Sequence, residues 1–270
     1  MNSLREKNIV VSGAAHGIGT AIVKALLEEG AYPLCIDIAQ FTRTELKKTL
    51  RGKAHLGKDF TYIQGDAGNE FLMQDAFRNV DRIDGLVNNA GLLGGDKTHG
   101  GRNIKALQKM FKAHVYTAFV LTEICAERMP AGSSIVNIGS IELIAAAPEV
   151  VQYTAAKGAL WGMTVSYATT LASKGIRVNT VSPGDVATQR NIAQYTKNAT
   201  ARQHIEHFRK RTPLEQRSVY PKEIADAVLF LLSEKSRAIT GQDIVVDLGH
   251  TRALVDPSWY ETSDGSQVYG

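Results

Sequence analysis

The chain has 270 residues, of which 44% are hydrophobic and 21% charged, and this composition is typical of a globular protein and excludes a disordered chain. The formal net charge of +4 at pH 7 is a mild excess spread along the sequence, so it argues only weakly for anionic ligands and gives no support to nucleic-acid binding. Two cysteines, Cys35 and Cys125, exclude a disulfide framework, and the sequence has no CxxC or paired-histidine spacing that would indicate a metal site.

The N-terminal segment and the hydropathy pattern predict a cytoplasmic protein that does not enter a membrane. Charges at Arg5, Glu6 and Lys7 precede only three apolar residues, too few for the hydrophobic region of a signal peptide. No run approaches the ~18 consecutive apolar residues of a membrane-spanning helix.

Short apolar runs alternate with longer helical patterns along the chain, which is typical of βαβ units and a parallel sheet. The expected strands are residues 8–12, 33–37, 60–64, 85–88, 134–138, 177–181 and 243–246. The main expected helices are residues 17–29, 70–80, 104–127, 150–173 and 222–233. This order predicts an α/β fold with a doubly wound, Rossmann-type parallel sheet of seven strands and helices on both faces.

No internal repeat, linker or break in composition divides the chain. We therefore expect one dinucleotide-binding and catalytic domain over residues 1–250, followed by a C-terminal tail over residues 251–270. The tail is rich in glycine, serine and aspartate and contains Trp259 and Tyr260. These aromatic residues are candidates to cover a substrate pocket, and a loosely ordered terminus is the alternative interpretation.

A cluster of glycines, Gly13, Gly17 and Gly19, lies between the first expected strand and the first expected helix. Glycines let the backbone turn tightly beside a pyrophosphate, and the first turn of the helix offers unpaired N–H groups and a positive dipole end. The second strand ends at Asp37, eighteen residues after Gly19, where a carboxylate can bond an adenosine ribose and repel a 2′-phosphate. NAD is therefore preferred over NADP, although His16 in the loop leaves room for a phosphate contact.

Tyr153 and Lys157 are four residues apart on an expected helix, so they lie on one face, ~6 Å apart along the axis. A nearby ammonium lowers the pKa of a phenol, so the lysine would tune the tyrosine as a proton carrier. Ser140 follows an expected strand at the carboxyl edge of the sheet, where its hydroxyl can orient a substrate oxygen. In isolation, such a pair is a plain helix face and such a serine is a helix cap.

Several motifs occur together in one order: SGAAHGIG from Ser12, QGDAGN around Asp66, NNAG at residues 88–91, Ser140, YTAAK from Tyr153, PGDVAT around Pro183 and GQDIVVDLG near the end. In this order they resemble the short-chain dehydrogenase/reductase family of the compact, single-domain type, over nearly the whole chain to about residue 250. The family motif TGxxxGIG has threonine where this chain has Ser12.

The resemblance implies roles for individual residues. Tyr153 would exchange a proton with the substrate oxygen, Ser140 would position that oxygen, and Lys157 would also bond the nicotinamide ribose. Pro183, Gly184 and Thr188 would hold the nicotinamide carboxamide. The implied cofactor-binding set is Gly13, His16, Gly17, Ile18, Gly19, Asp37, Asp66, Ala67, Asn89, Ala90, Gly91, Tyr153, Lys157, Pro183, Gly184, Val186 and Thr188.

Two positions depart from the family pattern. Where most members carry an asparagine that helps a water chain reach the lysine, this chain has His114, which either relays the proton as a further catalytic residue or is a core histidine. The usual DGG turn is Asp247, Leu248 and Gly249, which adds bulk at a close-packed position.

The sequence says less about the substrate than about the cofactor. Residues 185–213 correspond to the variable segment over the substrate and contain eight basic residues, which indicate either an anionic substrate or, preferably, a solvated helix face. The glycine-rich residues 92–103 form either a lid or a plain connection.

The function that the sequence favours is hydride transfer between NAD(H) and a small secondary alcohol or ketone, with a cyclic diol or dihydrodiol as a possible substrate class (EC 1.1.1 or 1.3.1 type). By resemblance the protein is a homotetramer or homodimer. The alternative is a non-catalytic nucleotide-sensing or scaffold protein on the same fold, which His114 and the altered turn favour and which the retained Ser140, Tyr153 and Lys157 oppose.

Overall fold

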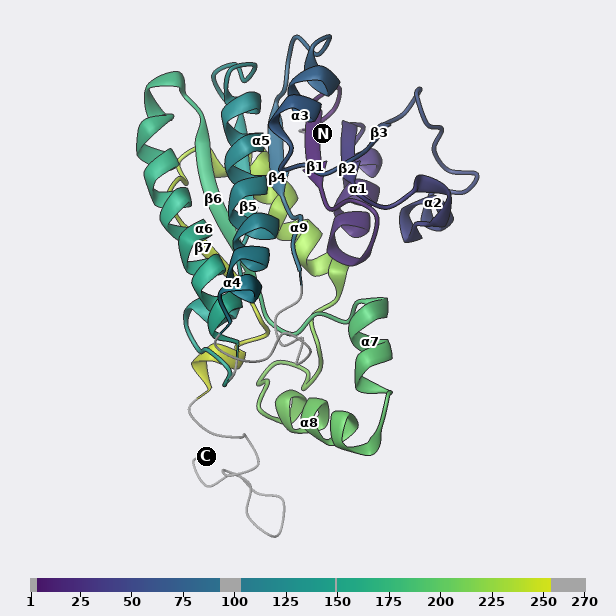
Figure 1. Cartoon of the computed structure of the whole chain (residues 1–270), viewed down its shortest axis with the longest axis vertical. Coiled ribbons are helices and arrows are strands. Elements are labelled where there is room, and N and C mark those ends of the chain that lie inside the picture. The colour runs from purple at the N-terminus through teal and green to yellow at the C-terminus, as the bar shows by residue number, and fades with distance from the viewer. Residues whose placement is uncertain (1–3, 93–102, 149, 254–270) are drawn as a thin grey trace.

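A parallel sheet of seven strands forms the centre of the protein, as a computed structural model shows for residues 4–92, 103–148 and 150–253 (Figure 1). The strands are β1 (Asn8–Ser12), β2 (Tyr32–Asp37), β3 (Thr61–Gln64), β4 (Gly85–Asn88), β5 (Ser134–Ile138), β6 (Arg177–Pro183) and β7 (Asp243–Val246). Their order is β3-β2-β1-β4-β5-β6-β7, and every neighbouring pair is parallel.

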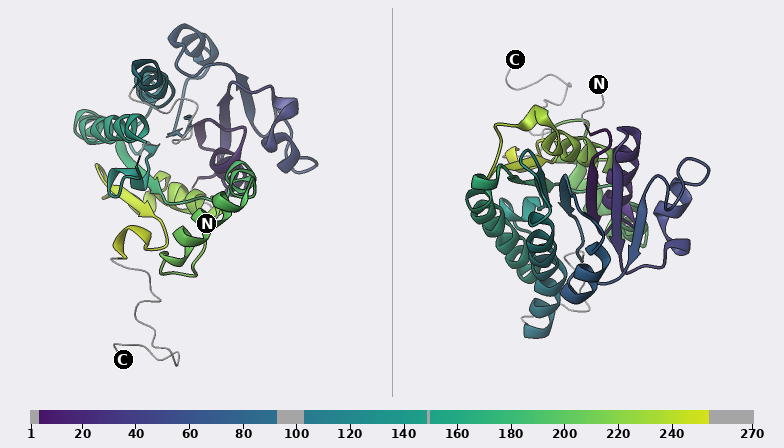
Figure 2. Two further views of the ribbon diagram at one scale, coloured as in Figure 1. Left: turned by 60° about the horizontal axis from the view of Figure 1, so that its bottom comes forward. Right: turned by 90° about the horizontal axis from the view of Figure 1, so that it is seen from above.

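The helices cover both faces of this sheet (Figure 2). They are α1 (Gly17–Glu28), α2 (Glu45–Thr49), α3 (Glu70–Phe77), α4 (Ile104–Phe111), α5 (Thr117–Ala126), α6 (Val151–Thr170), α7 (Gln189–Tyr195), α8 (Ala199–Lys210) and α9 (Pro221–Leu232). A π-helical turn, Lys112–Tyr116, joins α4 to α5. Short 3-10 turns cover Phe41–Arg43, Ile141–Leu143, Ala172–Lys174, Glu234–Ser236 and His250–Arg252.

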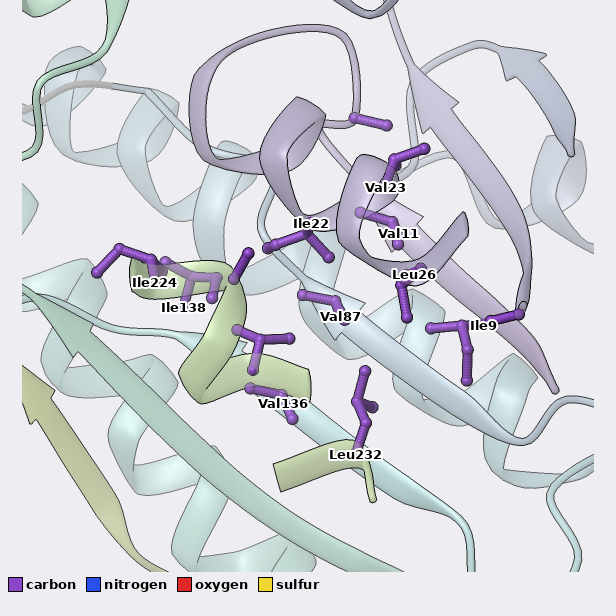
Figure 3. Packing of buried hydrophobic residues seen from close by; sticks show 14 of the residues in the cluster. Ile9, Val11, Ile22, Val23, Leu26, Val87, Val136, Ile138, Ile224 and Leu232 are labelled. Atoms are coloured by element: carbon purple, nitrogen blue, oxygen red, sulfur yellow. The ribbon is translucent and has the colours of Figure 1, made fainter. Parts of the chain in front are cut away.

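Alternating strand residues divide the core into two layers, because successive side chains of a strand point to opposite faces. Ile9 and Val11 of β1 pack with α1 and α9, and Figure 3 shows this cluster around Ile22, Leu26 and Leu232. Val10 points to the other face, into a cluster formed with residues of α3, α5 and α6. Both faces of the sheet are therefore buried, as a parallel sheet requires.

All seven expected strands are confirmed, with bounds that differ by at most two residues. The expected helix over residues 104–127 is α4, the π-helical turn and α5 in succession. Helices α2, α7 and α8 were not expected as separate elements. Helix α2 is too short for a periodicity signal, and α7 and α8 bury little apolar surface: Ile205 is the one buried residue that they contain.

The order of the strands places the site. Strands β1 and β4 are neighbours although two βα units separate them in the chain, so the connections run in opposite directions on either side of this pair. In such sheets, a crevice opens at the carboxyl ends of the strands where the order reverses. Helices α7 and α8 lie beyond this edge, below the sheet in Figure 1.

None of the helices in the described ranges combines the length and the apolar character of a membrane span. Trp259 and Tyr260, which we considered as a cover for the pocket, and most of the loop 92–103 lie outside the described residues.

Candidate active site

A cavity of about 1050 Å³ opens at the carboxyl edge of the sheet. It is lined by every predicted catalytic residue and by every predicted cofactor-binding residue except Gly19. Gly19 lies behind the loop, where a Cβ would clash with the Gly13 carbonyl oxygen and the Ala14 backbone. Glycine is therefore required at position 19 for packing. The other predicted residues share one cavity.

The glycine loop is held in a fixed shape beside the NNAG turn. Gly13 and Gly17 have φ values of +64° and +55°, a region that favours glycine. The Asn89 side-chain amide donates to the carbonyl oxygens of Ser12 (3.1 Å) and Gly13 (2.9 Å), and Ser12 Oγ accepts the Ala90 N–H at 3.1 Å. A hydroxyl at position 12 is thus sufficient for this contact, whether it comes from serine or from threonine.

The loop fits a dinucleotide because its glycines have no side chains and leave the backbone accessible. A Cβ at Gly13 would meet Ala90 Cα at 2.8 Å, so only glycine lets the loop pack this closely on the NNAG turn. Asp37 lies at the end of β2, where its two oxygens accept the N–H groups of Ala15 (3.0 Å) and Ala39 (2.9 Å). These contacts hold the carboxylate at the rim, as the ribose-binding prediction requires.

Asp66 follows β3 at the same edge. Its Oδ1 accepts the Gly68 N–H at 2.9 Å, and its Oδ2 lies 3.4 Å from Lys112 Nζ. Both Asp66 and Ala67 line the cavity.

Ser140, Tyr153 and Lys157 meet in this cavity. Ser140 follows β5, and its hydroxyl makes a hydrogen bond with the Tyr153 phenol oxygen. Tyr153 and Lys157 lie one turn apart on α6, and Lys157 Nζ is 5.6 Å from the centre of the tyrosine ring. The ammonium donates to the Ile138 carbonyl oxygen at 2.6 Å. The structure therefore brings together the three side chains that the spacing predicted.

The protonation of this trio differs from the expectation. Burial raises the pKa of Tyr153 above its ordinary value, and the Ser140 hydrogen bond offsets this only in part. Burial also lowers the pKa of Lys157 to about 7. The prediction that the lysine charge holds the pKa of Tyr153 below its usual range is therefore wrong for this structure, because desolvation disfavours both charged forms.

His114 lies in the π-helical turn and is buried against the cavity wall. Its Nε2 is 2.9 Å from the carbonyl oxygen and 3.1 Å from the nitrogen of Leu92, so the tautomer decides which contact is a hydrogen bond. The imidazole meets the Tyr153 ring edge-on, with ring centres 5.4 Å apart. Burial lowers the pKa of His114 to about 3, which argues against a relay through a charged imidazole near neutral pH. A neutral imidazole that holds a water remains a proposal.

The segment after β6 forms the opposite wall of the cavity. Gly184 packs so closely on Asp247 that a Cβ would meet Asp247 Cβ at 2.9 Å, and Thr188 Oγ1 caps α7 by accepting the Asn191 N–H at 3.2 Å. Leu248 has a φ of 56°, so this turn uses a backbone conformation that favours glycine. The Asp247 carboxylate stabilises the turn by accepting the Gly249 N–H at 2.9 Å.

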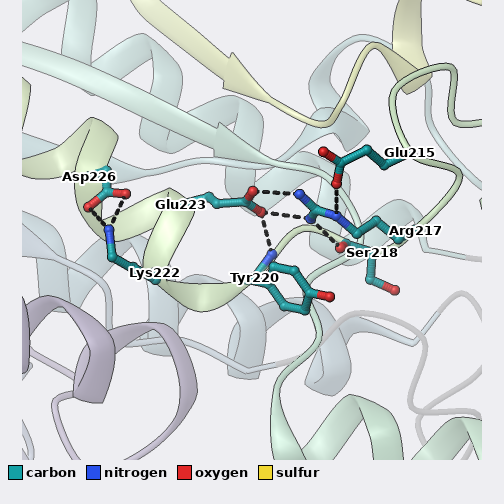
Figure 4. A network of polar contacts seen from close by, with 7 residues as sticks. All are labelled: Glu215, Arg217, Ser218, Tyr220, Lys222, Glu223 and Asp226. Carbon is teal, nitrogen blue, oxygen red and sulfur yellow. Dashed lines mark hydrogen bonds and ion pairs between the residues drawn. The ribbon is translucent and has the colours of Figure 1, made fainter.

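This wall is anchored to the start of α9. Val219 pairs with Val186 through the hydrogen bonds Val219 N–H to Asp185 O and Ala187 N–H to Val219 O, both 2.8 Å. Figure 4 shows the ion-pair network beside Val219, in which Arg217 binds both Glu223 oxygens, at 2.7 and 2.9 Å. The network fixes the strand-like segment that supports the predicted nicotinamide loop.

Asp185 and Glu45 are among the cavity residues that the sequence analysis did not predict. Asp185 lies inside the PGDVAT motif, accepts a hydrogen bond from the Tyr195 phenol and keeps a second buried oxygen without a partner. Glu45, at the start of α2, accepts the Gly17 N–H at 3.0 Å. The motif could have indicated Asp185, but no sequence signal places Glu45 beside a loop 28 residues earlier.

The basic residues of the variable segment mostly point to solvent. Lys197, Arg202, His204, His207 and Lys210 are exposed, as a solvated helix face predicts. Arg190 lines the cavity and is also exposed.

Comparisons with known proteins agree with this architecture. Residues 13–251 match the family described as Enoyl-(Acyl carrier protein) reductase. The uncharacterized short-chain type dehydrogenase/reductase y4vI of Sinorhizobium fredii is 33% identical over 89% of this chain, which spans only 43% of that longer protein. Cyclopentanol dehydrogenase of Comamonas sp. is 31% identical over 93% of this chain and 99% of its own length.

A solved structure extends the comparison to the fold. A putative gluconate dehydrogenase from Agrobacterium tumefaciens superimposes with a TM-score of 0.83 at 29% identity, and the match covers 94% of this chain and 99% of that one. Together with the cavity and its motifs, these matches show that the chain belongs to the short-chain dehydrogenase/reductase family of oxidoreductases.

Proposed function

We propose that this protein oxidises a small secondary alcohol to a ketone, or reduces the ketone, with NAD(H) as the cofactor. The family uses NAD(P) cofactors. The observation that carries the proposal is the shared cavity, in which Ser140, Tyr153 and Lys157 face the same space as the glycine loop. A protein that only senses nucleotides has no chemical need for this trio.

The side chains divide the work as follows. The Tyr153 phenol donates or accepts the proton at the substrate oxygen, and the Ser140 hydroxyl orients that oxygen and stabilises charge on it. Lys157, which donates to the Ile138 carbonyl oxygen, would also bond the nicotinamide ribose. A bound nicotinamide supplies the hydride chemistry. Pro183, Gly184, Val186 and Thr188 would hold its carboxamide end.

Asp37 supports NAD as the preferred cofactor. Its carboxylate is fixed at the rim by two backbone N–H groups, in reach of an adenosine ribose that follows the glycine loop. A carboxylate there accepts hydrogen bonds from ribose hydroxyls and repels a 2′-phosphate.

Asp185 supports a substrate with a second hydroxyl group, such as a cyclic diol. Its buried Oδ2 has no partner in the described part of the chain, and such an oxygen is costly unless a donor reaches it. A hydroxyl next to the reacting carbon would supply that donor, whereas an anionic group would be repelled. The similarity to a cyclopentanol dehydrogenase is consistent with a ring of this size.

We further propose a homotetramer or homodimer in the cytoplasm. Both cysteines, Cys35 and Cys125, are buried free thiols, which suits a reducing compartment. Exposed aromatic and aliphatic side chains on α5 and α6 suit an interface between copies.

The test is turnover of the wild type and of Tyr153→Phe with NAD⁺ and a panel of cyclic alcohols and their 1,2-diols, followed by absorbance of the reduced nicotinamide. We expect the wild type to prefer diols and Tyr153→Phe to lose about 10³-fold in kcat, the size of a general acid–base contribution. Calorimetric binding of NAD⁺ by the variant is the control for folding.

Two outcomes would contradict the proposal. Undiminished turnover by Tyr153→Phe would remove the tyrosine from the mechanism. Binding of NAD⁺ without turnover of any alcohol by the wild type would favour the nucleotide-sensing alternative.

A further inference from the structure

Helix α2 is docked directly onto the glycine loop. The Leu46 N–H donates to the Ala15 carbonyl oxygen at 3.1 Å, and the Leu46 side chain is fully buried in the core. Thr44 Oγ1 caps the helix by accepting the Lys47 N–H at 3.0 Å. The backbone of Glu45, between Thr44 and Leu46, is therefore fixed against the loop.

This docking places the Glu45 side chain on the first turn of α1. Its Oε2 accepts the Gly17 N–H at 3.0 Å, so one of the unpaired N–H groups that this helix offers to an anion is already used by a carboxylate. Asp37 takes the Ala15 N–H at 3.0 Å. Two residues of chain span at most about 7 Å, so the two carboxylates are fixed close together on the same loop.

Among the residues that the structure describes, no cation forms an ion pair that would neutralise the negative charge at this rim. None of the ion pairs between described residues involves Asp37 or Glu45. Both side chains line the cavity, together with His16 between their two bonding partners. His16, which we considered as a contact for a 2′-phosphate, therefore lies in the chain between the two residues whose N–H groups bind these carboxylates.

We propose that Glu45 is a second specificity-determining residue that acts with Asp37 to exclude the 2′-phosphate of NADP. The proposal rests on the proposed NAD binding. A 2′-phosphate at the ribose would bring a dianion to two fixed carboxylates, while the ribose hydroxyls of NAD bring only hydrogen-bond donors. Asp37 alone would repel the phosphate, and Glu45 also withdraws a backbone donor that could stabilise it.

The experiment compares NAD⁺ with NADP⁺, and 5′-AMP with adenosine 2′,5′-bisphosphate, by isothermal titration calorimetry on the full chain. Glu45→Gln keeps an oxygen that can accept the Gly17 N–H and removes the charge. We expect it to raise the affinity for the 2′-phosphorylated member of each pair relative to its partner about tenfold, because removing one partly screened negative charge weakens the repulsion of the 2′-phosphate. Asp37→Asn is expected to change the same ratio, and the double variant to change it further.

The matched control is Glu70→Gln. Glu70 is also an acidic residue in the first turn of a helix, next to a capping residue, but it is exposed and lies outside the cavity. It should leave both ratios unchanged, which separates a local effect from the loss of one net charge.

Each outcome decides the proposal. Unchanged affinity ratios in Glu45→Gln would overturn it. An equal gain in affinity for both members of each pair would also overturn it, because Glu45 would then compete with a phosphate that both ligands carry. A wild type that binds none of the four nucleotides would instead overturn the proposed function. Retained 5′-AMP or NAD⁺ binding by Glu45→Gln reports that the variant is folded.

Discussion

A buried histidine beside a proposed catalytic tyrosine shows how much of a residue's chemistry depends on its surroundings. His114 is at the position where a relay group was expected, and its ring contacts Tyr153. Burial is the largest influence on its pKa, and the positive charge of Lys157 adds to the same effect. Since its pKa falls to about 3, the imidazole is neutral across the range in which such an enzyme works.

The pKa of His114 makes stability depend on pH. The unfolded chain binds a proton at this histidine near pH 6.5, whereas the folded protein does so only near pH 3, so stability falls as the pH drops between these values. Between pH 6.5 and 4.5 the wild type should lose about 2 kcal/mol more than His114→Asn. Urea unfolding at pH 6.5 and pH 4.5 measures this difference.

The control is His204→Asn, which changes an exposed histidine of α8 and should keep the wild-type loss. Equal losses in His114→Asn and the wild type would contradict the assignment. The same variants test whether His114 relays a proton. A neutral His114 does not change its charge near pH 7, so the pH–rate profile of His114→Asn should have the same inflection as that of the wild type.

The sequence could identify the residues of the site better than their protonation. Tyr153 and Lys157 follow from a four-residue spacing, which needs only a helix. Their pKa values depend on desolvation by burial in the folded protein, which no local pattern encodes. Glu45 was missed for the same reason, because only the folded chain brings α2 to the glycine loop.

At the scale of elements, periodicity predicted the strands and long helices because each buries an apolar face. The strands β1 and β4 consist almost wholly of buried residues, and α9 buries Ile224, Val228 and Leu231 at helical spacing. The break between α4 and α5 was not predicted, because a π-helical turn continues the helical path and no glycine or proline marks it in residues 104–127. The segment between α8 and α9 is held by polar contacts and leaves no periodic signal.

Those polar contacts lead to a prediction about the start of α9. In addition to binding Glu223, Arg217 donates to the Ser218 carbonyl oxygen at 3.0 Å (Figure 4). Arg217→Ala should lower the free energy of unfolding by about 1 kcal/mol. It should also weaken NAD⁺ binding about threefold, because Val219 would hold the Asp185 segment less firmly. Urea unfolding and calorimetry measure both effects.

Lys222→Ala is the matched control for Arg217→Ala. Lys222 and Asp226 form an ion pair within the same helix, but both side chains are exposed and neither touches the cavity wall. This variant should leave stability and cofactor affinity unchanged. If the two variants behave alike, the Arg217 network does not support the loop.

At the scale of the whole molecule, the order of the strands could not be obtained from the strand pattern. A continuous apolar run indicates that a strand is buried on both faces, but it does not say which strands are neighbours. The position of β4 beside β1, on which the crevice depends, is a property of the complete sheet. The motifs in their order carried this information only through resemblance to a known family.

The surface of the molecule gives the last prediction, which concerns the proposed assembly. Tyr116 at the end of the π-helical turn, Phe119 of α5 and Val165 of α6 are 58%, 51% and 44% exposed. Helices α5 and α6 are neighbours here, since the rings of Phe119 and Tyr167 have centres 6.4 Å apart. A cluster of apolar side chains on two adjacent helices is costly in water and suits an interface with a second copy.

Phe119→Glu should therefore shift the protein toward smaller species, because burying a carboxylate in an apolar interface opposes association. Sedimentation velocity over a range of concentrations, read in multiples of 29.3 kDa, measures the shift. Phe71→Glu is the control, since Phe71 of α3 is 83% exposed and lies on another helix. A wild type that sediments as a monomer, or a Phe119→Glu variant that assembles as the wild type does, would show that this face of α5 and α6 is not the interface.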